Sequence, residues 1–368
     1  MPDGVLTIGC GARRAGAVEP PHPGCFSRAA MEDSFMDLHD GIPFWPRRDG
    51  ILGVRPQLTH DHRCEVVVVG AGITGALIAL ELTRRGLDVA VVDRRDSGGG
   101  STSASTAMLQ YEIDELLIDL TRALGAVDAT TAYQECSRGI DLVERVTQAV
   151  GHNCGFRRSP SLFMAVRKSD IATLADECAA RERAGFGVSW LDDTKLRDRW
   201  GLIGSAAIES AQGASVDPYA LTFHALDTVC RGGGSVFERT GVSAFEFSPR
   251  RVRLATDRGS TISAKHVVVA TGYEVAELLP DLPVSLHTSF ALVTQPIESL
   301  RHRYPDGMLF WDLDDPYLYG RTTDDGRLLI GGRDETYRDP VRRRRARPAK
   351  TRALARAVPS PPTTSAMS

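Results

Sequence analysis

A glycine-rich turn between a buried strand and a helix is the feature that most constrains the fold. Residues 64–69 form a β-branched run, which is typical of a strand covered on both faces in a parallel sheet. A G-x-G-x-x-G turn follows, and residues 73–85 then carry apolar side chains at helical spacing. Residues 87–92 are a second buried run. Together these segments predict a βαβ unit of the Rossmann type.

The spacing of the three glycines predicts a site for the pyrophosphate of a dinucleotide. Gly70 permits the tight turn, Gly72 lets the backbone approach the phosphates, and Gly75 lets the helix pack on the strand. The first helical residues, Ile73 and Thr74, would offer backbone N–H groups and the positive end of the helix dipole.

Charged residues after the second strand bear on which dinucleotide is bound. Asp93 stands where a carboxylate accepts hydrogen bonds from ribose hydroxyls, which argues against a ribose carrying a 2′-phosphate. Arg94 and Arg95 follow it. They face either the phosphates of the adenosine half or only water.

A second Gly/Ser cluster at residues 98–106 favours FAD over a nicotinamide cofactor. NAD needs no further phosphate-binding loop here, whereas the longer FAD molecule can use a second turn that opens a helix. The residues expected to contact FAD are Gly100, Ser101, Thr102 and Ser103. A flexible linker is the alternative interpretation.

Two later segments are expected to return to the same nucleotide. Residues 267–272 are a buried strand that ends in Ala-Thr-Gly, so Thr271 and Gly272 would form a tight turn beside it. The backbone around Val242 is expected at the adenine edge.

The chain as a whole predicts an α/β protein with a discontinuous organisation. We expect helices over residues 170–184 and 218–231, and β segments over residues 235–247 and 261–270. An Asp-Asp-Gly turn at residues 324–326 predicts a hairpin. The predicted parts are an irregular arm (1–63, with Met31 or Met36 as alternative starts), two FAD-domain segments (64–150 and 214–284), two substrate-domain segments (151–213 and 285–338), and a disordered tail (339–368).

Composition excludes several classes of protein. The fractions of hydrophobic (42%) and charged (25%) residues are those of a globular protein, and the net charge of −3 favours neither nucleic acid nor a membrane as partner. Seven scattered cysteines indicate reduced thiols, and no secretory signal or membrane span is apparent, so we expect a cytoplasmic protein. His60, His62 and Cys64 have no second ligand pair, so we predict no metal site.

The combination of Gly70 to Gly75, Asp93, the Gly/Ser loop, Val242 and Ala270-Thr-Gly272 resembles the FAD-dependent amino-acid and amine oxidase family. That family includes D-amino-acid oxidase, glycine and sarcosine oxidases and gamma-glutamylputrescine oxidase-like enzymes. The resemblance implies a Rossmann-like FAD-binding domain and a mainly antiparallel substrate domain. It implies oxidation of a C–N bond of an amino acid or amine by hydride transfer to flavin N5, with O2 or another electron acceptor.

The family pattern also suggests how the flavin and the substrate are held. FAD is expected to be non-covalent, because the Gly/Ser loop contains no His or Cys. Ala107 and Met108 stand where relatives carry glycines against the flavin ring. Arg321 is a candidate for binding a substrate carboxylate, and Tyr317 and Tyr319 alternate with it along one predicted strand. For these three residues, ordinary packing in the sheet is the alternative.

The sequence departs from the family pattern at its C-terminal end. From Val341 to Ser368 it has eight basic residues and no acidic one, where the family closes its FAD domain with a strand and a Gly-rich turn. We therefore expect a truncated or frame-shifted reading frame. Two other interpretations stay open: a non-catalytic nucleotide-binding remnant, and an NAD-dependent dehydrogenase.

Overall fold

The chain folds into two compact units. The structure, a computed structural model, describes residues 36, 38–275, 286–304, 306–337 and 339–357. The first unit comprises residues 1–105 and 218–285, and the second comprises residues 106–217 and 286–368. The first boundary therefore lies well before the expected residue 150. Helices α4 (Leu117–Leu124) and α5 (Ala126–Ala149), which we assigned to the FAD domain, contact α6 (Ile171–Arg183) and β7 (Ala206–Ser215) of the second unit.

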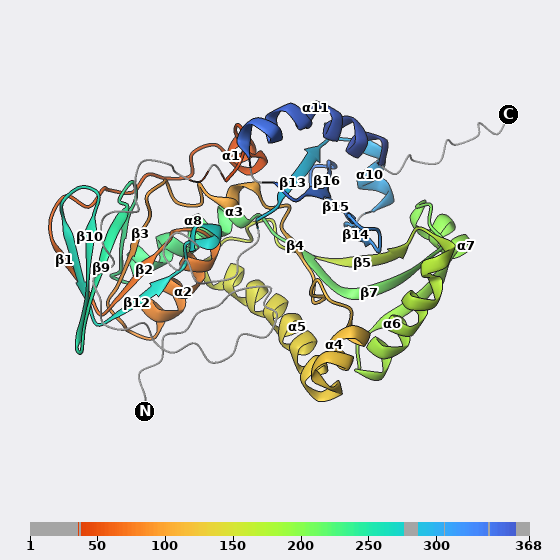
Figure 1. The fold of residues 1–368 in the computed structure, drawn as a ribbon, viewed down its shortest axis with the longest axis horizontal. Coiled ribbons are helices and arrows are strands. Elements are labelled where there is room, and N and C mark those ends of the chain that lie inside the picture. The colour runs from red at the N-terminus through yellow and green to blue at the C-terminus, as the bar shows by residue number, and fades with distance from the viewer. Residues whose placement is uncertain (1–35, 37, 276–285, 305, 338, 358–368) are drawn as a thin grey trace. The chain divides into compact units, whose positions relative to one another are not determined.

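A four-stranded parallel sheet organises the first unit. Its order is β12-β2-β3-β8, and every neighbouring pair is parallel, as Figure 1 shows for the strands beside α2. The strands are β2 (Val66–Val69), β3 (Val89–Val92), β8 (Ser235–Phe237) and β12 (His266–Val269), and the helices packed with them are α2 (Ile73–Arg84) and α8 (Pro218–Arg231). The α/β core predicted from the β-branched runs is confirmed.

A second sheet covers the other face of the parallel sheet. It has the order β1-β11-β10-β9, with β1 (His62–Arg63), β9 (Val242–Ser248), β10 (Arg251–Thr256) and β11 (Thr261–Ala264). Val67 and Val92 share one apolar cluster with Phe245 and Leu254 of this sheet. Because helices lie on one face and this sheet on the other, every residue of β2 and β3 is buried.

Part of the predicted irregular arm is ordered structure. Helix α1 (Phe44–Asp49) contacts α3 (Ser101–Ala104) and α8, and the side chains of Trp45 and Leu58 are 1% and 0% exposed. Because these isolated apolar residues have no periodicity, the pattern gave no sign of an element there. Residues 1–35, including the alternative start Met31, lie outside the described residues.

The second unit is built on an eight-stranded, mostly antiparallel sheet. The path is β13-β16-β15-β14-β5-β7-β4, with β6 also paired to β7. Its strands besides β7 are β4 (Met108–Leu109), β5 (Arg157–Ala165), β6 (Val188–Asp192), β13 (Thr288–Val293), β14 (Leu309–Asp312), β15 (Leu318–Thr322) and β16 (Leu328–Glu335). Strands β15 and β16 pair antiparallel, with Thr322 opposite Leu328, which confirms the predicted hairpin.

Short helices complete the two units. In the second unit, α10 (Glu298–Arg303) and the π-helical turn of residues Leu196–Trp200 contribute apolar side chains to one cluster on the sheet, and α6 contributes to another. The remaining short elements are η2 (Lys168–Asp170) and α7 (Asp193–Lys195) in the second unit and η4 (Gly272–Glu274) in the first.

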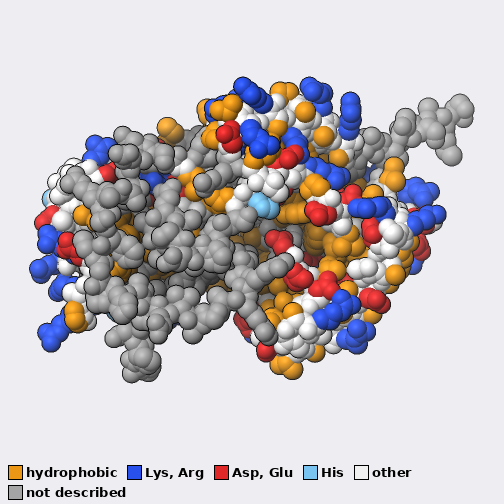
Figure 2. All heavy atoms as spheres, in the orientation of Figure 1, with side chains coloured by type: hydrophobic (Ala, Val, Ile, Leu, Met, Phe, Trp, Pro, Cys, Tyr) orange, Lys and Arg blue, Asp and Glu red, His pale blue; other side chains and the backbone are white. Residues whose placement is uncertain are grey.

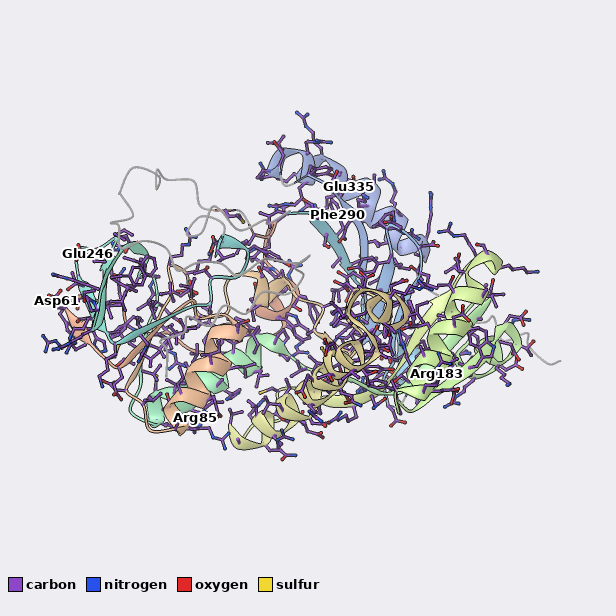
Figure 3. The ribbon with its side chains drawn as sticks, turned by 60° about the horizontal axis from the view of Figure 1, so that its bottom comes forward. Asp61, Arg85, Arg183, Glu246, Phe290 and Glu335 are labelled. Atoms are coloured by element: carbon purple, nitrogen blue, oxygen red, sulfur yellow. The ribbon has the colours of Figure 1, made fainter. Side chains whose placement is uncertain are left out.

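The prediction of a disordered tail is wrong for residues 340–357. These residues form helix α11 (Pro340–Ala357). At its start, Arg342 N donates a hydrogen bond to Asp339 Oδ1 (2.7 Å). Leu354 is buried in the apolar cluster that also contains Phe290, and Lys350 Nζ lies 2.6 Å from Glu335 Oε1. Figure 3 labels Phe290 and Glu335 beside this helix, and Figure 2 shows Lys and Arg side chains on its outer face. Arg, Ala, Lys and Leu all favour helix. Ala346 and Ala357 pack against the same apolar cluster as Leu354, so this charged run has an apolar side that holds it on the unit.

No helix within the described ranges combines the length and the apolar character needed to cross a membrane.

Candidate functional site

The first glycine-rich turn has the geometry that its spacing predicts. Gly70 has φ +115°, and a Cβ there would lie 2.3 Å from the carbonyl oxygen of Ala270. A Cβ on Gly75 would lie 1.8 Å from the carbonyl oxygen of Gly70. Gly72 precedes α2, whose first turn contains Ile73 and Thr74 and no acidic residue. The backbone therefore presents the positive end of α2 without a carboxylate of its own.

The Gly/Ser loop at residues 98–106 lies against the first glycine-rich turn. Gly98 N donates to Ala71 O (3.0 Å), and Ile73 N donates to Thr102 Oγ1 (3.0 Å). A Cβ on Gly72 would lie 3.1 Å from that same Thr102 oxygen. The two loops thus form one continuous surface, and the flexible-linker interpretation is wrong.

The residues of this cluster form the short helix α3. Thr102 and Ser103 are buried, and Ser103 Oγ donates to Gly100 O (2.8 Å). Ser101 is half-buried at the start of the helix. The hydroxyl groups of Thr102 and Ser103 therefore hold the loop in shape, so we expect backbone N–H groups to provide most of its contacts with phosphate.

Asp93 fixes the backbone beside the first turn. Its Oδ2 accepts from Ala71 N and its Oδ1 accepts from Arg95 N, both at 2.7 Å. Burial raises the pKa of this carboxyl above its usual value. Arg94, placed among the cofactor contacts by the sequence, forms an ion pair with Glu274. Each oxygen of Asp93 keeps a further lone pair that a ribose hydroxyl could use.

The later segments also reach this region of the first unit. Thr271 and Gly272 follow β12. The pairing of β12 with β2 extends one residue further, because Ala270 N donates to Val69 O (2.8 Å). Within the described part of the chain, nothing hydrogen-bonds the buried Oγ1 of Thr271. Val242 stands at the start of β9 opposite Thr256, with its side chain in the apolar cluster between the sheets.

These observations test whether the unit fits a dinucleotide. Gly70 and Gly75 leave no room for a Cβ against the backbone of the turn, Gly72 keeps the backbone bare at the start of α2, and Thr271 offers a buried hydroxyl that a ligand oxygen could satisfy. The residues present therefore fit the adenosine and pyrophosphate parts of FAD.

Several supporting residues were missed at the sequence level. Trp45 Nε1 donates to Ser105 O (2.7 Å) just after α3, and His39 Nε2 lies 3.1 Å from Gly99 O. Buried Glu238 accepts from Ser97 N (3.0 Å) and from Arg55 N (2.9 Å). These residues are single positions far apart in the sequence, so no local pattern identifies them. Only folding brings them to the loop.

The three catalytic candidates lie on or beside β15 of the second unit. Arg321 is 4% exposed, and its Nη2 donates to Val216 O (3.3 Å). The rings of Tyr317 and Tyr319 have centroids 5.6 Å apart, and Tyr319 packs on the cluster that contains Trp311. Tyr317 precedes the strand and is 39% exposed. The structure therefore brings the tyrosines together and makes Arg321 a buried cation.

Met108, expected at the flavin ring, lies on β4. It pairs with Ser215 of β7, and its partly buried side chain packs on the same cluster as Tyr319. Ala107 before it has φ +54°, a conformation that favours glycine. Ala107 therefore has a backbone conformation that glycine adopts more readily than alanine does.

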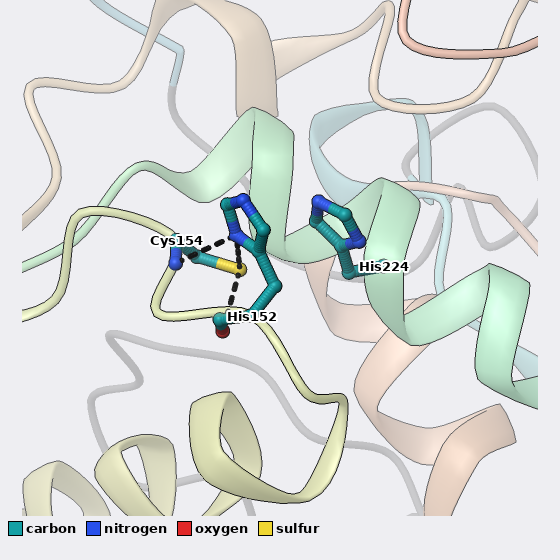
Figure 4. A group of neighbouring side chains, drawn as sticks. All are labelled: His152, Cys154 and His224. Carbon is teal, nitrogen blue, oxygen red and sulfur yellow. Dashed lines mark hydrogen bonds between the residues drawn. The ribbon is translucent and has the colours of Figure 1, made fainter.

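A cysteine next to a histidine in the second unit is not an activated nucleophile. Cys154 N donates to His152 Nδ1 (2.9 Å), and the thiol lies 3.4 Å from the same nitrogen (Figure 4). Burial raises the pKa of Cys154 to about 12. A thiol with such a pKa stays protonated at neutral pH, so these contacts stabilise the turn.

Comparison with known proteins agrees with the geometry. The family model for FAD dependent oxidoreductases (DAO) matches residues 65–360. This chain belongs to that family of FAD-dependent oxidoreductases.

Individual relatives share low sequence identity with this chain. Gamma-glutamylputrescine oxidoreductase of Escherichia coli K12 is 26% identical over 281 residues, which cover 73% of this chain and 64% of that protein. The chain thus spans less than two thirds of the length of this relative. The structure is similar to those of glycine oxidase from Geobacillus kaustophilus (TM-score 0.62, 22% identity, 74% of this chain and 72% of that one) and L-proline dehydrogenase from P. horikoshii (TM-score 0.61, 20% identity, 73% and 70%). These likenesses show the fold.

Proposed function

We propose that this protein binds FAD non-covalently and oxidises a C–N bond of a small amine or amino acid. The observation that carries the proposal is the joining of the two glycine-rich loops by the Ile73–Thr102 and Gly98–Ala71 hydrogen bonds. A second phosphate-binding loop is what FAD needs and NAD does not. The relatives named for amine and amino-acid substrates support the choice of a C–N bond.

The residues of the first unit have distinct roles in holding the cofactor. Gly70 permits the tight turn, Gly72 lets the backbone approach the pyrophosphate, Gly75 lets α2 pack on β2, and the N-terminus of α2 counters the negative charge of the phosphates. The carboxylate of Asp93 accepts hydrogen bonds from the ribose. Thr271 and Gly272 bound the site at the end of β12, and Val242 is proposed at the adenine edge.

A bound flavin would supply the acceptor for a hydride from the substrate, and O2 or another acceptor would take up the electrons. The chain itself has to position the donor carbon. Arg321, buried on β15, is the proposed partner of a substrate carboxylate, because a guanidinium can hold both carboxylate oxygens. Tyr319 on β15 and Tyr317, the residue just before that strand, are proposed as the aromatic wall.

Cofactor binding is tested with the purified protein. The flavin absorbance band should be present, and release of FAD by acid or heat denaturation should show that it is non-covalent. FAD at 100 times its Kd should raise the free energy of unfolding by about 2.7 kcal/mol. A colourless protein that binds NAD would support the dehydrogenase instead. No stabilisation by either cofactor would support the non-catalytic remnant.

A matched pair of glycine variants locates the site. Gly72→Val places a branched side chain against Thr102 and should abolish stabilisation by FAD. Gly187→Val is the control, because a Cβ at that exposed glycine meets nothing within 4 Å. FAD binding that survives in Gly72→Val would show that the pyrophosphate lies elsewhere.

The substrate class is tested through Arg321. Arg321→Met should raise KM for amino acids far more than for amines without a carboxylate, since only the former lose an ion pair. Arg253→Met, which removes an exposed arginine from β10, should leave both KM values unchanged. Equal effects on both substrate classes would remove Arg321 from the proposed carboxylate site.

A further inference from the structure

A buried glutamate at the end of β12 binds both arginines that follow Asp93. Glu274 is 5% exposed. Its two oxygens accept from Nη1 and Nη2 of Arg95, both at 2.7 Å, and Arg94 Nη2 lies 2.9 Å from its Oε1. The bidentate geometry is the strongest arrangement of such a pair. All four charged residues belong to the first unit.

The two arginines of this cluster lie next to Asp93, where a dinucleotide with a 2′-phosphate would need a cation. A Rossmann-type fold that accepts a 2′-phosphate does so with an arginine near the acidic residue of the second strand. This chain has two such arginines, yet both guanidinium groups are bound by Glu274. Because the Glu274 carboxylate already pairs with both guanidinium groups, less of their positive charge is available to a 2′-phosphate.

We infer that Glu274 is a specificity-determining residue that neutralises Arg94 and Arg95 and thereby excludes dinucleotides with a 2′-phosphate. The inference rests on the proposed dinucleotide site. It assigns the choice between a ribose hydroxyl and a phosphate to a residue about 180 positions away from Asp93, in the short helix η4 that follows β12.

The test measures binding of two small probes to the full chain freed of flavin. 5′-ADP carries both of its phosphates at the 5′ position, like the adenosine end of FAD, whereas 2′,5′-ADP carries one of its two phosphates on the 2′ oxygen of the ribose. The wild type should bind 5′-ADP and discriminate against 2′,5′-ADP. Glu274→Gln should bind 5′-ADP as the wild type does and 2′,5′-ADP at least about tenfold tighter than the wild type does, a change of about 1.4 kcal/mol.

Two further variants grade the effect. Asp93→Asn together with Glu274→Gln removes both negative charges and should bind 2′,5′-ADP tighter still. Arg94→Gln in the Glu274→Gln background should reverse part of the gain. Glu65→Gln is the matched control, because Glu65 pairs with Lys265 (2.7 Å) at the opposite end of the same two strands and should leave both affinities unchanged.

Each outcome decides the inference. The inference would be overturned by unchanged 2′,5′-ADP binding in both Glu274→Gln and Glu274→Ala, or by a gain in Glu65→Gln equal to that in Glu274→Gln. Loss of 5′-ADP binding in Glu274→Gln and also in Glu274→Ala would overturn it too, because Glu274 would then be needed for the site itself. Failure of the wild type to bind 5′-ADP would instead overturn the proposed cofactor site, and the inference with it.

Discussion

Each unit of this protein contains a small cluster of arginine and carboxylate side chains, and the two clusters differ in surroundings. In the second unit Arg181 is 1% exposed and binds Glu177 and Glu112, each at 2.8 Å. In the first unit Glu274 binds Arg94 and Arg95, whose side chains are 19% and 25% exposed. One cluster is sealed from water and the other lies at the ends of parallel strands.

This difference in exposure gives the two clusters different roles. Glu177 also accepts from Leu117 N and Ile118 N, both at 3.0 Å, so the sealed cluster fixes the start of α4 against α6. Removing one partner of a sealed cluster leaves an uncompensated charge in a low dielectric. The cluster at the strand ends keeps access to solvent, so losing a partner there changes charge at a ligand site more than it changes stability.

The largest effect is expected from the sealed cluster. Arg181→Met leaves Glu112 and Glu177 without their cation and should lower the free energy of unfolding by about 3–5 kcal/mol. Urea unfolding at neutral pH measures this. A loss below about 1 kcal/mol would mean that water reaches the cluster. Adding Glu112→Gln to Arg181→Met should restore part of the loss.

A smaller, pH-dependent effect should come from Glu112. Burial raises the pKa of its carboxyl above the usual 4.5, and no described residue hydrogen-bonds its buried Oε2. A raised pKa in the folded state contributes stability that is present below pH 4.5 and is lost as pH rises through the folded-state pKa. Glu112→Gln keeps a neutral side chain, so the variant should gain stability relative to the wild type as pH rises from 4.5. Urea midpoints across this range test the sign, and a constant difference would contradict the raised pKa.

The cluster at the strand ends should contribute less to stability. Glu274→Gln is expected to lower the free energy of unfolding by about 1 kcal/mol, since both arginines can be solvated. The measurement is urea unfolding of the flavin-free chain. A loss as large as that of Arg181→Met would make the two clusters equivalent, which their exposure argues against.

The smallest effect is expected where both partners are exposed. Glu65→Gln breaks the pair with Lys265, whose side chains are 36% and 56% exposed, and should change the free energy of unfolding by no more than about 0.5 kcal/mol. Raising the salt concentration should reduce even this difference.

Local patterns predicted the parts of the site that are contiguous in sequence. The turn from Gly70 to Gly75 and the acid at Asp93 follow from short-range spacing, because a buried strand, a tight turn and a helix leave few other residue choices. Helix α8 was predicted with the bounds observed, Pro218–Arg231. The family match supports the cofactor inferred from these residues.

Long-range features could not be predicted in the same way. Residues 261–270 read as one β segment, yet the chain divides them between β11 and β12, which belong to different sheets. The alternating residues 261–264 pack one face on a cluster, whereas β12 pairs in parallel with β2. A β-branched run specifies an extended backbone but not its partner strand.

The sequence by itself determined the glycine-rich turn, the α/β class and the resemblance to FAD-dependent amine oxidases, because these depend on short motifs, each of which is contiguous in sequence. Only the tertiary structure decided that Trp45 supports the second loop, that the basic C-terminal run forms α11, and that Glu274 meets Arg94 and Arg95. Such contacts join residues far apart in the chain, and the folding of intervening strands is what brings their side chains within hydrogen-bonding distance.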